Sequence, residues 1–237
     1  MPGCSSARMR ILMHITKRNF LKGALGAGLG ALTMIESALA GERTADAPKG
    51  ESSGGKGEIV RIPDVSIRMR SPDSVLVGIS PTEVIEITLA EVLKFHGYCA
   101  GGVTFSFRAA QEAFKVLYGD RLAMRQNLKV QTSFHCCQAG ALAYITGART
   151  DFGAIPNRGD LTLIPEERRI ILLQDKKTGE RAVLKARFNP HHIFSPLFER
   201  VRKDPGFSPE VWKALNDAVE EYIHGPVENL FSEVRKS

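Results

Sequence analysis

The chain has 237 residues, of which 43% are hydrophobic and 24% are charged, a composition typical of a globular protein with a buried core. Its formal net charge is +6, but residues 1–40 carry five basic side chains against one acidic side chain. The remainder of the chain is therefore only weakly basic, and we do not expect it to bind nucleic acid.

The N-terminus resembles an export signal. Lys17-Arg18 precedes an apolar run rich in Gly and Ala, and Ala38-Leu39-Ala40 ends this run with small residues at the positions that a signal peptidase reads. The basic pair resembles the twin-arginine (Tat) export motif in a Lys-Arg form, and the Sec route is the alternative. We expect residues 1–40 to be removed after Ala40, leaving a periplasmic or otherwise extracytoplasmic protein without a stable membrane span. The glycines of the run argue against the other interpretation, an N-terminal anchor helix.

The folded domain is expected to follow a linker. Residues 41–57 are polar and rich in Gly, Ser, Lys and Glu, which indicates a flexible linker without packed structure. The domain itself is predicted over residues 58–230. Near its start, residues 59–62 and 75–79 are apolar enough for two short strands.

Two helix patterns follow one another in the middle of the domain. Thr88 and Glu91 have the spacing of a capping box, which would open a short helix, and Gly97 is a favoured stop residue. A second helix is predicted over residues 103–118, because apolar side chains recur there at helical spacing.

Strand patterns and two more helices complete the domain. Residues 128–132 alternate between apolar and polar side chains as a half-buried strand does, and the Ala-rich residues 138–146 are predicted to be helical. Three further strands are predicted over residues 161–164, 169–173 and 181–186, with a hairpin joining the last two.

A closing helix should begin at a Ser208 cap, followed by Pro209 as its first residue. Its apolar face would consist of four residues at helical spacing: Val211, Leu215, Val219 and Tyr222. The order of all these elements predicts a single α+β domain.

The cysteines limit the chemistry that the domain can perform. Removal of the signal would take away Cys4 and leave Cys99, Cys136 and Cys137. An odd number of cysteines in an oxidising compartment does not suggest a disulfide framework. It indicates a metal site, a reactive thiol, or one disulfide with a spare thiol.

A metal site is the interpretation that the spacing favours. His96 and Cys99 are three residues apart at a predicted helix end, so both side chains can point at one spot. Cys137 would join them from the start of another helix, where the partial positive charge lowers the pKa of a thiol such as Cys136 or Cys137. A His/Cys/Cys set with one position left open suits zinc or another divalent transition metal. We therefore predict His96, Cys99 and Cys137 as metal ligands.

The same residues have other interpretations. Cys99 and Cys137 could be small buried core residues, or they could form a disulfide. The vicinal Cys136-Cys137 could be a redox pair, and His96 could simply interact with the dipole of its helix. His191-His192, beside a proline, is interpreted as a surface turn rather than as a pair of ligands.

Two segments resemble a known family. His96-Gly97-Tyr98-Cys99-Ala100-Gly101, followed by a helix that carries Arg108, resembles the H-G-H-x-C-P-G…G-x-R start of the FmdE family, named after the E subunit of formylmethanofuran dehydrogenase. Tyr98 stands where that motif has a second histidine. The family's second segment, C-x-x-D-A-x-Q-x-x-T-G, is matched from Cys137 onward, with Gly140 in place of the aspartate.

The resemblance covers roughly residues 85–190 and has several implications. It implies an FmdE-like α-β-α-β-β-β core with a mixed sheet, to which this chain adds the C-terminal helix, and it implies a homodimer. It also supports metal binding at the three predicted ligands. Residues that could serve as additional ligands are Tyr98, His135 and Cys136. Arg108 would lie on a helix facing the motif, where it could bind an anion or substrate or remain solvated.

Two functions remain open. The first is an exported metal-binding FmdE-family protein with an accessory or carrier role. The second is an enzyme that uses the open metal position or a Cys thiolate on a small substrate, related to one-carbon or formylmethanofuran chemistry. Because Gly140 replaces the aspartate that could act as acid or base, we favour binding over catalysis. The expected partners are a metal or small molecule and a second copy of the chain.

Overall fold

The structure, a computed structural model, describes residues 59–97, 99–133, 137–151 and 158–237. The predicted export signal with its cleavage after Ala40 and the predicted linker lie outside these described residues. The same holds for three of the predicted ligands: Tyr98, His135 and Cys136.

A small three-stranded sheet forms the first layer of the described domain. Strand β1 (Ser66–Arg70) pairs with β2 (Val84–Thr88) in antiparallel orientation and with β3 (Ala123–Met124) in parallel orientation. The helix α2 (Pro72–Leu76) connects β1 to β2.

Both strands predicted at the start of the domain are wrong. Residues 59–62 form no strand, and the first strand begins four residues after them, at Ser66. The apolar residues 75–79 lie at the end of α2 and in the turn after it, where Leu76 and Ile79 are mostly exposed. Pro72 at the first position of α2 is pre-set for helical backbone, and this local preference decides the conformation of a segment that has no buried partner.

Two helices then carry the first half of the candidate site. The capping box that opens α3 (Leu89–His96) is present, with the Thr88 hydroxyl accepting from the Glu91 amide at 3.2 Å and the Glu91 carboxylate accepting from the Thr88 amide. Gly97 ends the helix with a positive φ of 109°. The next helix, α4 (Ala100–Tyr118), confirms the second predicted helix and extends it by one turn at its start.

A five-stranded mixed sheet forms the opposite layer. Its strand order is β5-β4-β6-β7-β8, in which β4 and β5 are parallel and the other pairs are antiparallel. The strands are β4 (Leu128–Thr132), β5 (Leu161–Leu163), β6 (Ile170–Asp175), β7 (Arg181–Ala186) and β8 (Phe231–Lys236). The four strands predicted in this region are confirmed, whereas β8 was not predicted.

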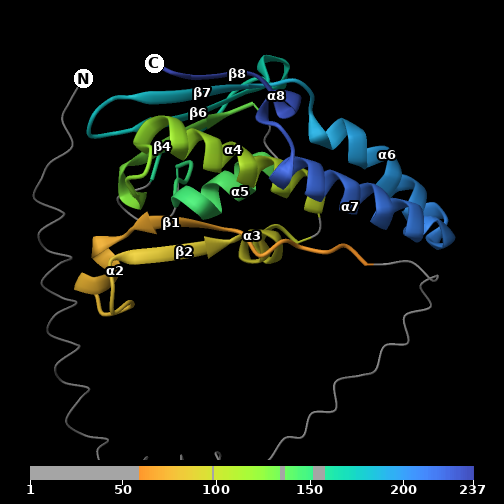
Figure 1. The fold of residues 1–237 in the computed structure, drawn as a ribbon, viewed down its shortest axis with the longest axis horizontal. Coiled ribbons are helices and arrows are strands. Elements are labelled where there is room, and N and C mark those ends of the chain that lie inside the picture. Colours follow the sequence, from red (N-terminus) through yellow and green to blue (C-terminus); the bar gives the residue numbers. More distant parts are fainter. Residues whose placement is uncertain (1–58, 98, 134–136, 152–157) are drawn as a thin grey trace, which may run out of the picture. The chain divides into compact units, whose positions relative to one another are not determined.

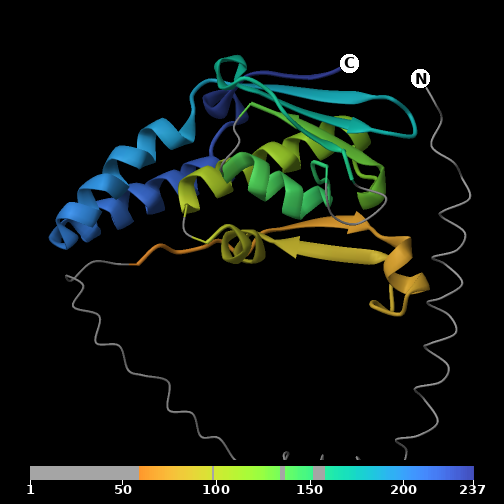
Figure 2. The ribbon, with the colours of Figure 1, turned by 180° about the vertical axis from the view of Figure 1, so that it is seen from behind.

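The core lies where helices are held between the two sheets. Figure 1 shows α4 and α5 (Cys137–Thr146) between the five-stranded sheet and the small sheet, and Figure 2 shows the same layers from behind. The largest fully buried side chains of α4 are Phe105, Phe107 and Leu117, and those of α5 are Leu142 and Ile145. The described domain is therefore α+β, as predicted, with a mixed sheet and a C-terminal helix.

The C-terminal part contains one more long helix than predicted. Helix α6 (Pro190–Lys203) starts at an Asn189 cap, whose side-chain oxygen accepts from the His191 amide at 2.9 Å. His191 and His192 are exposed, as a surface position requires, but they belong to the first turn of this helix and the predicted turn is wrong. Asn-Pro before an amphipathic run was the overlooked helix signal.

Helix α7 (Ser208–His224) confirms the predicted closing helix, and all four residues of its predicted apolar face are buried. Ser208 is the first residue of the helix rather than its cap, and its hydroxyl donates to the Pro205 carbonyl at 2.8 Å. The remaining short elements are α8 (Val227–Leu230) and the 3-10 helices η1 (Arg125–Asn127), η2 (Glu166–Arg168) and η3 (Pro205–Phe207).

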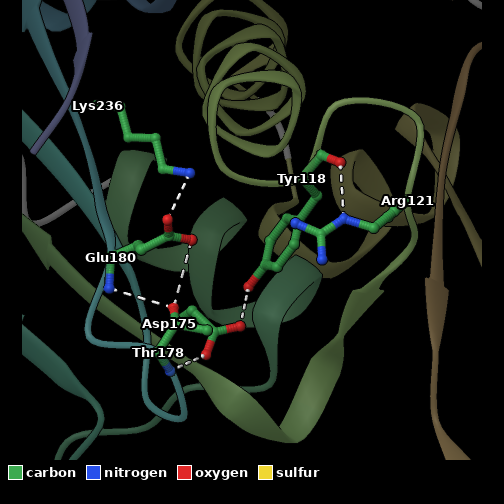
Figure 3. Close-up of polar contacts among 6 residues, drawn as sticks. All are labelled: Tyr118, Arg121, Asp175, Thr178, Glu180 and Lys236. Atoms are coloured by element: carbon green, nitrogen blue, oxygen red, sulfur yellow. Dashed lines mark hydrogen bonds and ion pairs between the residues drawn. The ribbon is translucent and has the colours of Figure 1, made fainter.

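A buried carboxylate organises the turn between β6 and β7 (Figure 3). The Asp175 carboxylate accepts hydrogen bonds from the Tyr118 hydroxyl at 2.7 Å and from the amides of Lys177 and Thr178 at 2.8 and 2.9 Å. Burial of Asp175 favours its neutral form, but these hydrogen bonds outweigh burial and hold its pKa below the ordinary value. Burial of Tyr118 and its bond to this carboxylate raise the pKa of the phenol.

This carboxylate stabilises the fold over a defined pH range. Because the pKa of Asp175 is lower in the folded chain, its contribution is fully present above the unfolded-state value of about 3.9. The contribution is lost as the pH falls through the lower folded-state pKa.

Among the described helices, none combines the length and the hydropathy that crossing a lipid bilayer requires.

Candidate metal centre

Three side chains with soft or borderline ligand atoms meet where α3, α4 and α5 come together. His96 is the last residue of α3, Cys99 is the N-cap of α4, and Cys137 is the first residue of α5. One imidazole nitrogen of His96 and the two Sγ atoms all lie within 4.8 Å of one another. Cys99 and Cys137 are only 3% and 6% exposed, whereas His96 is partly exposed. The fold thus brings together three residues that the sequence places on three separate elements.

A missing side chain lets the two thiols lie side by side. A Cβ atom added to Gly102, in the first turn of α4, would lie 2.7 Å from Cys137 Cβ, 2.8 Å from Cys137 Sγ and 3.2 Å from Cys99 Sγ. The first two distances are shorter than a Cβ atom tolerates, so any larger residue at this position would displace Cys137. Glycine at position 102 therefore allows the N-terminal ends of α4 and α5 to approach closely.

The donor set fits a transition metal. Bonds of about 2.0–2.3 Å to a tetrahedral zinc place neighbouring ligand atoms roughly 3.5 Å apart, so the three groups need only a small closing movement to share one ion. One nitrogen and two sulfurs form the borderline-soft set that zinc favours. The two thiols are not bridged to each other in a disulfide. His96, Cys99 and Cys137 could therefore hold a metal ion.

A small cavity adjoins the thiol of Cys137. Its volume is about 10 Å³, which is room for roughly one water molecule. Polar side chains from three elements contribute to its wall: Ser106, Gln138, Asn189 and His191. None of these residues was predicted as a site residue. For Asn189 and His191 the reason is that α6, which begins at Pro190, was not recognised as a helix, whereas no local signal distinguished Ser106 or Gln138 within their predicted helices.

Hydrogen bonds fix the orientation of α5 at both ends. In its first turn, the Gln138 side chain accepts from the Thr132 hydroxyl of β4 at 2.8 Å. At its last turn, Arg125 donates to the carbonyls of Tyr144 and Ile145 at 2.6 and 3.0 Å. Burial of Arg125, and then the charge of nearby Arg149, lower the pKa of its guanidinium. This bracing holds Cys137 at the helix end whose partial positive charge favours a thiolate.

A tyrosine from the closing helix lies near the first thiol. Tyr222 of α7 is buried against the aromatic rings of Phe105 and Phe188. Burial raises the pKa of Tyr222 to about 12, with further contributions from nearby Cys99 and Glu221. The phenol therefore stays neutral beside the thiol. The sequence indicated that Tyr222 packs in the core, but no local signal pointed to its proximity to Cys99.

Arg108 has structural partners. Its Nη1 donates to the Ile223 carbonyl at 2.9 Å, and its Nη2 lies 3.2 Å from a Glu112 carboxylate oxygen. The hydrogen bond to Ile223 joins α4 to the end of α7, whereas the ion pair with Glu112 lies within α4. Binding of an anion by Arg108 stays a prediction.

Comparisons with known proteins agree with the motifs. Residues 95–232 match the family described as FmdE, molybdenum formylmethanofuran dehydrogenase operon. A solved structure of a tungsten formylmethanofuran dehydrogenase FmdE-like protein from Syntrophus aciditrophicus is similar, with 22% identity and a TM-score of 0.36. That similarity covers 64% of this chain and 72% of the other. No curated protein matches. Since the family match spans more than half of the residues, the chain belongs to the FmdE family.

Proposed function

We propose that this FmdE-family protein is exported and binds a zinc-like transition metal through His96, Cys99 and Cys137, in an accessory or carrier role. The observation that carries the proposal is the convergence of one imidazole nitrogen and two thiol sulfurs within 4.8 Å. The clearance at Gly102 supports it, because a side chain there would push Cys137 out of this arrangement.

The surroundings of the three ligands suit binding. Both thiols are buried, which limits their reaction with oxidants in solution. The ends of three helices supply the ligands, and bracing at Gln138 and Arg125 keeps Cys137 in place before any ion arrives. A metal bound with one open position would supply a Lewis acid to a ligand in the adjoining cavity.

Catalysis is the second candidate function. The observation that favours it is the small polar cavity beside Cys137, which offers a place for a water molecule or a reacting group. Gly140 argues against catalysis, because it has no side chain that could act as an acid or base. The position itself is close to the site, since a Cβ atom added there would lie 3.5 Å from His96 Nδ1. Substituting Ser106, which lines the cavity, would separate the two functions: loss of turnover with metal retained would favour an enzyme.

Metal content is the direct test of the proposed site. The unprocessed full chain should contain about one zinc or similar metal, measured by plasma mass spectrometry, and His96→Ala, Cys99→Ser and Cys137→Ser should each lose it. Matched controls are His224→Ala and Cys4→Ser, which change the same residue types elsewhere and should retain the metal. Retention of metal in both Cys99→Ser and Cys137→Ser would refute the proposal. So would a titration in which the wild-type chain binds no metal.

The sequence supports export, and the resemblance to the FmdE family supports pairing of two copies. The basic pair at Lys17-Arg18 and the small residues ending at Ala40 favour export. Mass measurement of the mature protein from a periplasmic fraction should give an N-terminus at Gly41. Sedimentation equilibrium should show a homodimer if the family resemblance extends to assembly.

A further inference from the structure

Two arginines lie side by side at the open end of the β6–β7 pair. Arg169 directly precedes β6 and Arg187 directly follows β7. Because the strands are antiparallel, the two positions are neighbours, and the Ala186 amide donates to the Arg169 carbonyl at 2.8 Å. The Arg169 Nη1 donates to the carbonyl of Arg187, and the Arg187 Nε donates to the carbonyl of Glu228. Each guanidinium group thus donates one hydrogen bond to a main-chain carbonyl.

Neither guanidinium is neutralised within the described part of the chain. No ion pair joins Arg169 or Arg187 to a described carboxylate. One oxygen of Glu166, Oε1, accepts from the Asn189 side chain and lies 3.3 Å from His192 Nε2. Among the described residues, no ion pair offsets the positive charge of either arginine.

Both arginines line a cleft of about 480 Å³, which is within the size range of small-molecule sites. Phe188 and Ile193 add apolar surface to the cleft, and Asn189 and His192 add polar groups. Asn189 also lines the small cavity beside Cys137, so the two hollows share one wall. Glu166 and Glu167 of the 3-10 helix η2 line the cleft as well, the first partly buried and the second exposed.

The backbone at Arg169 turns the chain from η2 into β6. Its φ is +49°, and it is the one non-glycine residue with a positive φ among those that the structure describes. Arg169 is the C-cap of η2, where its amide donates to the Glu166 carbonyl at 3.1 Å. This turn sets where the Arg169 side chain leaves the backbone, at the edge of a cleft that the side chain lines.

We propose that this cleft binds the oxyanion group of a small ligand, a carboxylate or a phosphate, with Arg169 and Arg187 as its charged donors. Guanidinium groups suit such anions because two parallel N–H groups match two oxygens. The apolar side chains accommodate the ligand's carbon skeleton. Asn189 lies between this cleft and the small cavity beside Cys137. The cleft needs no metal to bind its anion.

Binding of two defined probes to the full chain tests this site. Inorganic phosphate and succinate are titrated separately into the protein at low ionic strength, and isothermal calorimetry measures the binding. The probe with the lower dissociation constant identifies the preferred oxyanion. Arg187→Gln and Arg169→Gly should each weaken binding about tenfold or more, since each removes charge-assisted hydrogen bonds. Glycine at 169 preserves the left-handed backbone, and unfolding curves establish that both variants fold.

Two controls make the result decisive. Arg168→Gln removes the same charge from an exposed neighbour that does not line the cleft, and it should bind like the wild-type chain. His96→Ala, which should lose metal, should keep anion binding, so failure of the metal proposal is distinguishable from failure of this one. Absence of binding for both probes at millimolar concentration, wild-type affinity in both arginine variants, or an equal loss in Arg168→Gln would overturn the proposal.

Discussion

A single methyl group at Gly102 tests whether the close approach of α4 and α5 builds the metal centre. In Gly102→Ala, the new Cβ would lie 2.7 Å from Cys137 Cβ and 2.8 Å from Cys137 Sγ. Rotation of the Cys137 side chain could move Sγ but not Cβ, which is fixed to the backbone at the start of a helix braced by hydrogen bonds. The start of α5 must therefore shift, and Cys137 must move away from Cys99 and His96.

Two opposing effects set the change in stability. Alanine is favoured over glycine inside a helix by about 1 kcal/mol. Adding a methyl group to a filled site costs typically about 1–3 kcal/mol. We expect the unfolding free energy of the metal-free protein to fall by about 0–2 kcal/mol. Metal affinity should fall by roughly 10–100-fold, the usual effect of disturbing the support of a ligand.

Gly140→Ala is the matched control. It also replaces a helical glycine beside the site, but its Cβ would lie 3.5 Å from His96 Nδ1, an ordinary van der Waals contact. This variant should gain up to about 1 kcal/mol of stability and keep its metal affinity. Urea unfolding without metal and competition titration with a chelator measure the two quantities. If Gly102→Ala gains as much stability as Gly140→Ala and binds metal equally well, the close approach does not build the site.

Two further predictions concern the scaffold around the site. Tyr118→Phe removes the donor to Asp175 and should lower the unfolding free energy at pH 7 by about 1–2 kcal/mol. This loss should shrink as the pH falls through the lowered pKa of Asp175, and a loss independent of pH would contradict the assigned hydrogen bond. Arg125→Gln leaves two carbonyls at the end of α5 without their charged donor and should cost about 1–3 kcal/mol in urea unfolding. Arg121→Gln, which loses one exposed 3.4 Å hydrogen bond, should change stability by less than about 0.5 kcal/mol, and equal losses would refute the bracing role.

Elements with strong local signals were predictable from the sequence. The capping box at Thr88 and the stop at Gly97 satisfy backbone groups within a few residues, so α3 has the predicted bounds at both ends. Strand β4 alternates apolar and polar residues at a period of two, whereas β6 and β7 are short, mostly apolar runs joined by a turn, and the structure places all three as predicted.

The errors arise where local pattern and tertiary burial disagree. The apolar residues 75–79 suggested a buried strand, but most of their side chains are exposed, and they form the end of α2 and the turn after it. Strand β8 was not predicted because residues 231–236 are largely polar, and only pairing with β7 makes them a strand. In both cases the conformation depends on whether another segment packs against these residues or pairs with them.

The candidate site was likewise predictable from the sequence only in part. The residue types and spacing of His96, Cys99 and Cys137 suggested a shared metal site. His96 and Cys99 lie three residues apart at the end of one predicted helix, and Cys137 lies at the start of another. Only the tertiary structure revealed the close approach at Gly102 and the electrostatic interaction between Tyr222 and Cys99. Spacing along the chain determines what neighbouring residues can do together. The packing of α4 between two sheets, driven by burial of its apolar surface, determines which distant residues become neighbours.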